Sequence, residues 1–168
     1  QEKIVERLDK VFKNINTQIE ICNLNSESIK MFFNEYLDKY FSKKFNNTKK
    51  FSELIKTVEN KKWSHEQNEN HKYIEISSVS NTEFKINSYS AINNIDPPSR
   101  AKKIVLENDV LFATTRPTLK RVAVVPKEFN NQIASTGFFV FRLFDKIDRY
   151  FLFYYLISNK FKKIMKNI

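Results

Sequence analysis

The tetrapeptide Asp96-Pro97-Pro98-Ser99 is the stretch of the chain that comes nearest to a catalytic signature. Adenine-N6 methyltransferases carry Asp or Asn, two prolines and an aromatic residue where they hold the flipped target base, on which the ring can stack. Ser99 has no ring, and the chain has a single glycine, Gly137, so it cannot form the glycine-rich turns that let a backbone approach a cofactor. The proline pair is instead predicted to form a stiff, extended turn before a strand.

Three other short patterns contain the residue types of catalytic or metal sites. Glu83-Phe84-Lys85 resembles the end of a nuclease metal motif, but no suitably placed acid precedes it on a strand. Ser135-Thr136-Gly137 has no histidine nearby, so we interpret it as a bend that enters a strand. His65 and His71 have no neighbouring cysteine or closely spaced acids and are interpreted as surface histidines. The sequence therefore predicts no catalytic residue, no metal site and no cofactor.

Positive charge is concentrated between Pro97 and Lys127, where the acidic residues are limited to Glu107 and Asp109. The strands expected in this span are apolar, so most of the cations should project from turns and strand ends around one small sheet. Such a display suits a phosphate backbone. The cations are Arg100, Lys102, Lys103, Arg116, Lys120, Arg121 and Lys127.

Arg116 is the cation best suited to reading a base. Pro117 is expected to restrict the backbone of Arg116 to an extended form, and the guanidinium fork matches guanine O6 and N7 or a phosphate. The alternative is an arginine that pins its loop by bonding backbone carbonyls or an acid. Tyr89, Asn93 and Asn94 lie in the polar loop before the proline turn and are further candidates, since Asn can read adenine and Tyr can contact phosphate or stack. A solvated loop in an asparagine-rich chain is the alternative for these three.

The composition agrees with a nucleic-acid partner. The chain has 168 residues and a formal charge of +10, which attracts polyanions at long range. The alternative is a basic protein without a nucleic-acid partner, whose lysine and asparagine content reflects codon bias. The one cysteine, Cys22, allows no intrachain disulfide, and no apolar run approaches the roughly 18 residues of a membrane helix, so a cytoplasmic location is expected.

Residues 1–45 contain neither glycine nor proline, and apolar residues recur there at alternating steps of four and three. This pattern predicts one long amphipathic helix of the coiled-coil type, which needs a partner helix because its apolar seam would otherwise remain in water. A helical hairpin broken around the polar stretch 23–26 is the alternative. The seam residues are Ile4, Leu8, Val11, Ile15, Ile29, Phe32 and Tyr36.

Residues 46–168 differ in composition from the helical segment before them, and they begin with a polar, lysine-rich boundary. Five β-branched and aromatic runs are predicted to be strands, and the last segment is predicted to be a helix capped by Asp148. The predicted fold class is α+β, with the long helix followed by a mixed α/β domain that contains a small twisted sheet. The strand runs are 73–79, 104–106, 110–114, 122–125 and 138–141, and the helix is 148–168.

Several segments, which together extend over almost the whole chain, resemble one known family. The opening QEKIVERLDKVFKNI is similar to a conserved helix, Gln-x-x-Ile-Val-x-x-Leu-Asp, of the specificity (S) subunits of Type I restriction-modification systems. The segments PSRAKKIVLENDVLFATTRPTLKRVAVVP, IASTGFFVFR and YFLFYYLISNKF are similar to the core of that family's target recognition domain. Asn108 stands where the family often has glycine before Asp109, a replacement that a turn tolerates.

The resemblance implies a spacer and dimerisation helix at 1–45 and a target recognition domain at 46–168 that is incomplete at its C-terminal end. It implies non-catalytic, sequence-specific recognition of double-stranded DNA that directs methylation and cleavage by partner subunits. Those partners are methyltransferase subunits, the translocase-nuclease subunits that join through them, and a second conserved helix or a homodimer partner. The alternatives are a protein-interaction adaptor with incidental basic charge and, third, a methyltransferase or nuclease fragment.

Overall fold

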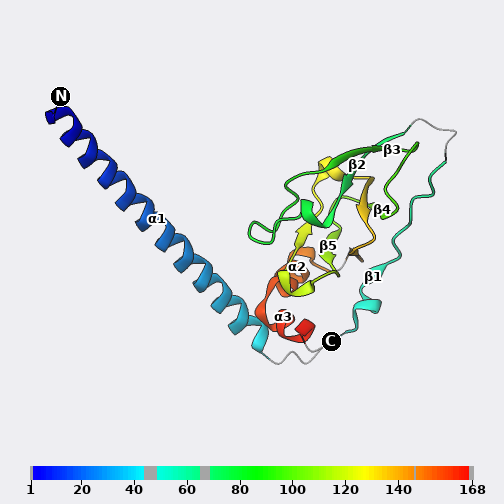
Figure 1. Ribbon diagram of the computed structural model, residues 1–168. Helices are drawn as coiled ribbons and strands as arrows, with labels where there is room; N and C mark the ends of the chain where they lie inside the picture. The colour runs from blue at the N-terminus through cyan, green and yellow to red at the C-terminus, as the bar shows by residue number, and fades with distance from the viewer. Residues whose placement is uncertain (1, 44–48, 65–68, 146, 167–168) are drawn as a thin grey trace. The chain divides into compact units, whose positions relative to one another are not determined.

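Helix α1 runs without a break from Glu2 to Ser42, so the helical hairpin alternative is wrong. The computed structural model describes residues 2–43, 49–64, 69–145 and 147–166, and the side chains of α1 from residue 13 onward. No helix in these ranges combines the length and the apolar character needed to cross a membrane. The chain divides into two compact units, Gln1–Tyr40 and Phe41–Ile168, of which the first is helix alone (Figure 1).

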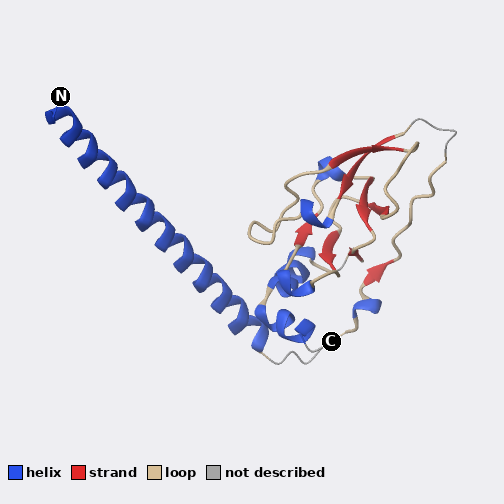
Figure 2. Cartoon of the chain, viewed as in Figure 1, coloured by secondary structure: helices blue, strands red, loops and turns tan. Residues whose placement is uncertain are grey.

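The second unit contains two four-stranded sheets. The first sheet is antiparallel throughout, and the second has one parallel pair, β2 with β7, between antiparallel neighbours. In spatial order the first sheet is β1 (Ile55–Lys56), β8 (Phe138–Leu143), β5 (Val110–Ala113) and β6 (Val122–Val124). The second is β3 (Ser90–Asn93), β2 (Asn70–Ile74), β7 (Gln132–Ser135) and β4 (Ala101–Val105). Figure 2 shows the strands in red.

The α+β class is confirmed, but the single small sheet and the five-strand count were wrong. Strands β1, β3 and β7 are short and partly polar, and they form because neighbouring strands offer free hydrogen-bonding edges. The predicted strand 73–79 also ends early. After β2 the chain turns into a short 3-10 helix, η2 (Ile76–Ser78), because the Ser78 hydroxyl accepts from the backbone N–H of Glu75.

The hydrophobic core lies between the two sheets. Ile74, Val105 and Ala134 from the second sheet belong to the same buried cluster as Leu111 and Val140 from the first. Every residue of β5 is buried, because helix α2 (Arg149–Ile157) packs against β5 and β6. This two-sided burial explains why β5 reads as a continuous apolar run.

The predicted C-terminal helix is correct at its start and wrong at its middle. The Asp148 carboxylate accepts from the backbone N–H groups of Tyr150 and Phe151, as expected of an N-cap. At Ser158 the backbone is extended, and the fully buried hydroxyl donates to the Tyr155 carbonyl at 2.6 Å. A separate helix, α3 (Asn159–Lys166), follows.

A buried ion pair joins β8 to the turn between β4 and β5. The Asp109 carboxylate accepts from Arg142 Nη2 at 2.8 Å and Nε at 3.1 Å, and also from the backbone N–H of Leu106. Arg142 further donates to the Ile104 carbonyl. Asn108 has a positive φ of 71°, which asparagine adopts more readily than most residues.

Candidate nucleic-acid interface

Four loop segments meet at one edge of the second unit: residues 75–79, 98–100, 114–121 and 135–137, here called the loop cluster. The strand registers bring them together, because parallel β2 and β7 end at the same edge, where antiparallel β4 begins. Strand β5 ends opposite the start of β8. Backbone bonds connect the segments: Thr136 N–H donates to Arg100 at 2.9 Å, and Thr114 N–H donates to Gly137 at 2.9 Å.

Arg121 holds the loop cluster together from within. Its guanidinium donates to the backbone oxygens of Ile76, Ser77 and Val79. These bonds give Arg121 the carbonyl-pinning role that is the alternative for Arg116, and its contact with DNA stays a prediction. Gly137 lies under the same segment, where a Cβ would come within 2.4 Å of the Ile76 Cδ1 atom.

Arg116 does not have the extended backbone that its following proline predicts. It lies in the left-handed region, with φ 52° and ψ 60°, because its carbonyl closes a turn with the Leu119 N–H at 3.0 Å. A non-glycine residue in this region is strained and is held there by its surroundings. The side chain is exposed and makes no hydrogen bond or ion pair with the described residues. Arg116 is therefore presented to solvent on a constrained turn.

The other predicted cations fall into three situations. Arg100 is exposed in the loop cluster without a side-chain partner in the described ranges, and Lys102 is exposed just beyond it on β4. Lys120 lies in the cluster, and its Nζ donates to Asn159 Oδ1 at 2.8 Å. Lys103 is half-buried on the edge of β4, where it pairs with Asn60. The fold thus gathers Arg100, Arg116 and Lys120 at one edge.

Two of the three polar loop candidates, Asn93 and Asn94, lie away from that edge, whereas Tyr89 precedes Ser90, which pairs with Tyr73 near the cluster end of β2. Asn93 is in register with Asn70, at the opposite end of β2 from the cluster. Asn94 is 3% exposed, and its amide donates to the Ser64 carbonyl at 2.7 Å, which gives it an internal structural role. Its contact with DNA stays a prediction. Tyr89 is half exposed and lies against Phe129, with ring centroids 5.8 Å apart.

The histidines form no metal site in the described part of the chain, which holds no group of three or more potential metal ligands. His65 lies outside the described residues. His71 is half-buried rather than fully on the surface, with Nε2 hydrogen-bonded to Glu69 at 3.0 Å. Hydrogen bonds from Lys61 and His71 lower the pKa of Glu69.

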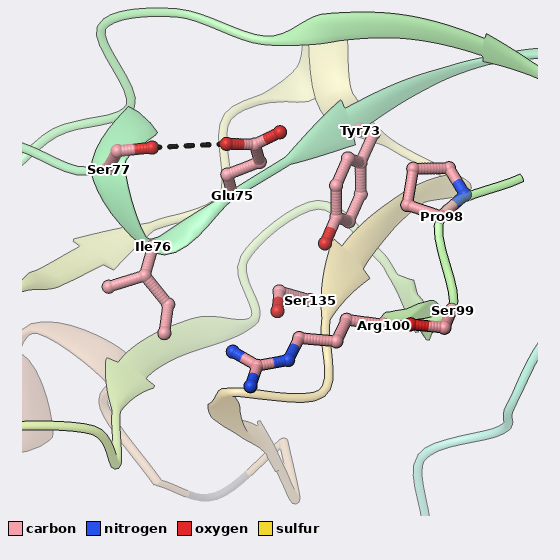
Figure 3. Close-up of a pocket in the computed structure, with 8 residues that line it drawn as sticks. All are labelled: Tyr73, Glu75, Ile76, Ser77, Pro98, Ser99, Arg100 and Ser135. Atoms are coloured by element: carbon pink, nitrogen blue, oxygen red, sulfur yellow. Dashed lines mark hydrogen bonds between the residues drawn. The ribbon is translucent and has the colours of Figure 1, made fainter.

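A pocket of about 340 Å³ opens within the loop cluster (Figure 3). Figure 3 shows Arg100 crossing one side of this space, with the Tyr73 hydroxyl directed into it and Glu75 on the side of η2. The sequence reasoning did not select Glu75, because it assigned that residue to the middle of a strand. The remaining lining residues are Ile76, Ser77, Pro98, Ser99 and Ser135.

The seam of α1 is an exposed apolar stripe in its described part. Ile15, Ile29, Phe32 and Tyr36 are 47%, 68%, 65% and 68% exposed. The side chains of Ile4, Leu8 and Val11 lie outside the described residues. Exposed apolar stripes of this extent mark interaction surfaces.

Comparisons with known proteins agree with the resemblance seen in the sequence. The solved HsdS subunit from Thermoanaerobacter tengcongensis is 38% identical, with a TM-score of 0.58 over 61% of this chain. A structure from work on complex assembly and conformational transition of the Type I R-M system is 36% identical, with a TM-score of 0.63 over 66% of this chain. This chain spans 27% and 29% of the lengths of those two chains. No curated protein matches.

A family model for the Type I restriction modification DNA specificity domain matches residues 42–168, which include both sheets and the whole loop cluster. The match covers well over half of the chain, and it agrees with the two solved structures. The chain belongs to the Type I restriction modification DNA specificity domain family.

Proposed function

We propose that this chain recognises one part of a double-stranded DNA site, in a sequence-specific manner, for a Type I restriction-modification complex. The observation that carries the proposal is a pair of exposed arginines, Arg100 and Arg116, which have no side-chain partner among the described residues and lie on loops that converge at one edge. A guanidinium with no internal partner is available for guanine or phosphate, and backbone bonds already order its loop. The proposed secondary contacts are Tyr89, Asn93, Lys102, Lys103 and Lys120, whereas the side chains of Asn94 and Arg121 bond the chain's own backbone.

Arg116→Ala is expected to weaken binding to the cognate half-site by about 1–3 kcal/mol if Arg116 reads a guanine. Affinity for random DNA should change far less, since a base contact adds nothing on a wrong sequence. Lys127→Ala is the matched control, because this exposed cation lies at the far end of β7 from the cluster. An equal loss on cognate and random DNA would assign Arg116 to a phosphate instead.

The exposed seam of α1 is proposed to pair with a second conserved helix or a second copy of the chain, and to help dock methyltransferase subunits. Ile15→Lys is expected to abolish self-association or pairing with the partner helix, as measured by sedimentation, because it places a charge in an apolar interface. Thr17→Lys adds the same charge on the opposite face and should have no effect. Unchanged assembly of the Ile15 variant would contradict the seam.

The same stripe favours a second candidate, a protein-interaction adaptor whose charge is incidental. Reversing Lys120 and Arg121 would not separate the two functions, because Arg121 supports η2 from within. Reversing Arg100 and Arg116 does separate them, since neither side chain holds the fold together. An adaptor would keep its activity after that change.

In this function the chain is non-catalytic and needs no cofactor. Methylation would be performed by methyltransferase subunits, and cleavage by the translocase-nuclease subunits that join through them, in the cytoplasm. Binding assays with S-adenosylmethionine and Mg²⁺ test the remaining reading as an enzyme fragment. Saturable binding of either ligand to the isolated chain would contradict the proposal.

A further inference from the structure

Glu75 is the one acidic residue among the four segments of the loop cluster. Its carboxylate is exposed and accepts from the Ser77 hydroxyl at 3.2 Å, while its backbone N–H donates to Ser78. It forms no ion pair with any cation of the described residues. A carboxylate on a face proposed to meet phosphates is repelled by them, so any hydrogen-bond donor that it meets on DNA is a base rather than the backbone.

Arg100 lines the same pocket as Glu75, and the two opposite charges do not bond each other (Figure 3). The position of Arg100 is prepared by its backbone. Its carbonyl accepts from Thr136 N–H at 2.9 Å, and the Ala101 N–H donates to Pro98 at 2.8 Å. The two prolines that precede it further limit the turn. The proline stretch thus serves to hold Arg100 at the pocket.

The edges of base pairs narrow the possible ligands. In the major groove the hydrogen-bond donors are the amino groups of cytosine N4 and adenine N6, and the pairing typical of Glu is with cytosine. The pairing typical of Arg is with guanine O6 and N7. Cytosine N4 and guanine O6 lie side by side in one G·C pair, so a carboxylate and a guanidinium that share a pocket match that pair.

We propose that the pocket between η2 and the proline turn reads a single G·C base pair, with Glu75 accepting from cytosine N4 and Arg100 donating to guanine. The inference rests on the proposed function in DNA recognition and adds a specificity residue, Glu75, to it. An A·T pair with adenine in the place of guanine would be rejected, because Arg100 would face the adenine amino group and Glu75 the thymine O4 and methyl group. In the reversed pair thymine offers Arg100 only O4, so the two-acceptor contact that guanine O6 and N7 provide is lost. The carboxylate therefore contributes to discrimination more than to affinity.

The test is selection of bound duplexes from a randomised DNA library by the 168-residue chain, followed by sequencing. The wild-type chain is expected to prefer G·C at one position. Glu75→Gln should reduce that preference by about fivefold or more and raise the share of adenine, since Gln pairs with adenine N6 and N7. Arg100→Lys keeps the charge but loses the fork, so it should weaken the guanine preference at the same position.

Glu107→Gln is the matched control, because Glu107 is an exposed acid at the far end of β4 from the cluster, and its removal changes net charge equally. Thermal unfolding shows whether each variant is folded. If the Glu75→Gln variant does not fold, the Arg100→Lys variant alone provides the test. An unchanged base preference in the folded variants overturns the inference and leaves the proposed function standing. Failure of the wild-type chain to bind any duplex overturns the proposed function itself.

Discussion

Replacing Arg100 and Arg116 together by glutamate is expected to lower the affinity for cognate DNA by at least about a hundredfold, since each lost arginine contact costs about 1–3 kcal/mol and the new charges repel phosphates. Both side chains are exposed and have no partner among the described residues, so the fold should survive. The measurement is a binding titration at several salt concentrations. If both arginines bind phosphates, the salt slope should also fall by about two.

Reversal of Lys50 and Lys127 is the matched control. Both are exposed lysines outside the loop cluster, so the double change alters net charge by the same amount. If the two double variants lose affinity equally, overall charge attracts the DNA and the loop cluster does not read it. If the arginine variant still binds DNA like the wild-type chain while assembly also persists, the adaptor reading is favoured.

Asp109→Ala is expected to destabilise the second unit by about 3–5 kcal/mol, because it leaves the Arg142 charge buried without a partner. The two side chains are 3% and 16% exposed, so water cannot easily replace the lost carboxylate. The backbone N–H of Leu106 loses its acceptor as well. Chemical denaturation measures the change in the free energy of unfolding.

Glu107→Ala in the same turn is the control for Asp109, because it removes an exposed carboxylate and should have little effect. A double change, Asp109→Leu with Arg142→Met, should recover much of the lost stability by removing both charges. A loss below about 1 kcal/mol for Asp109→Ala would mean that Arg142 finds another partner or reaches solvent.

Elements with strong local signals could be predicted from the sequence. Helix α1 has a sustained apolar period without a breaker, and β5, β6 and β8 are dense in β-branched and aromatic residues. Strands β1, β3 and β7 could not be predicted, because each has four residues or fewer and is partly polar, so its own sequence carries little strand signal. The break between α2 and α3 at Ser158 could not be predicted from the sequence either, since serine is tolerated within helices. The capping role of Ser158 is evident from its complete burial and its hydrogen bond to Tyr155.

The sequence by itself predicted a nucleic-acid partner and determined the long apolar seam, because net charge and apolar periodicity are properties of composition and local order. The tertiary structure decided which polar groups act together. Strand register brings Arg100 and Arg116 to one edge and leaves Asn93 at the other end of β2. Arg116 and Arg121 are near neighbours with the same side chain, yet one faces solvent and the other bonds three carbonyls. The position of η2, to which Arg121 bonds from a distant part of the sequence, separates their roles and places Glu75 and Arg100 around one pocket.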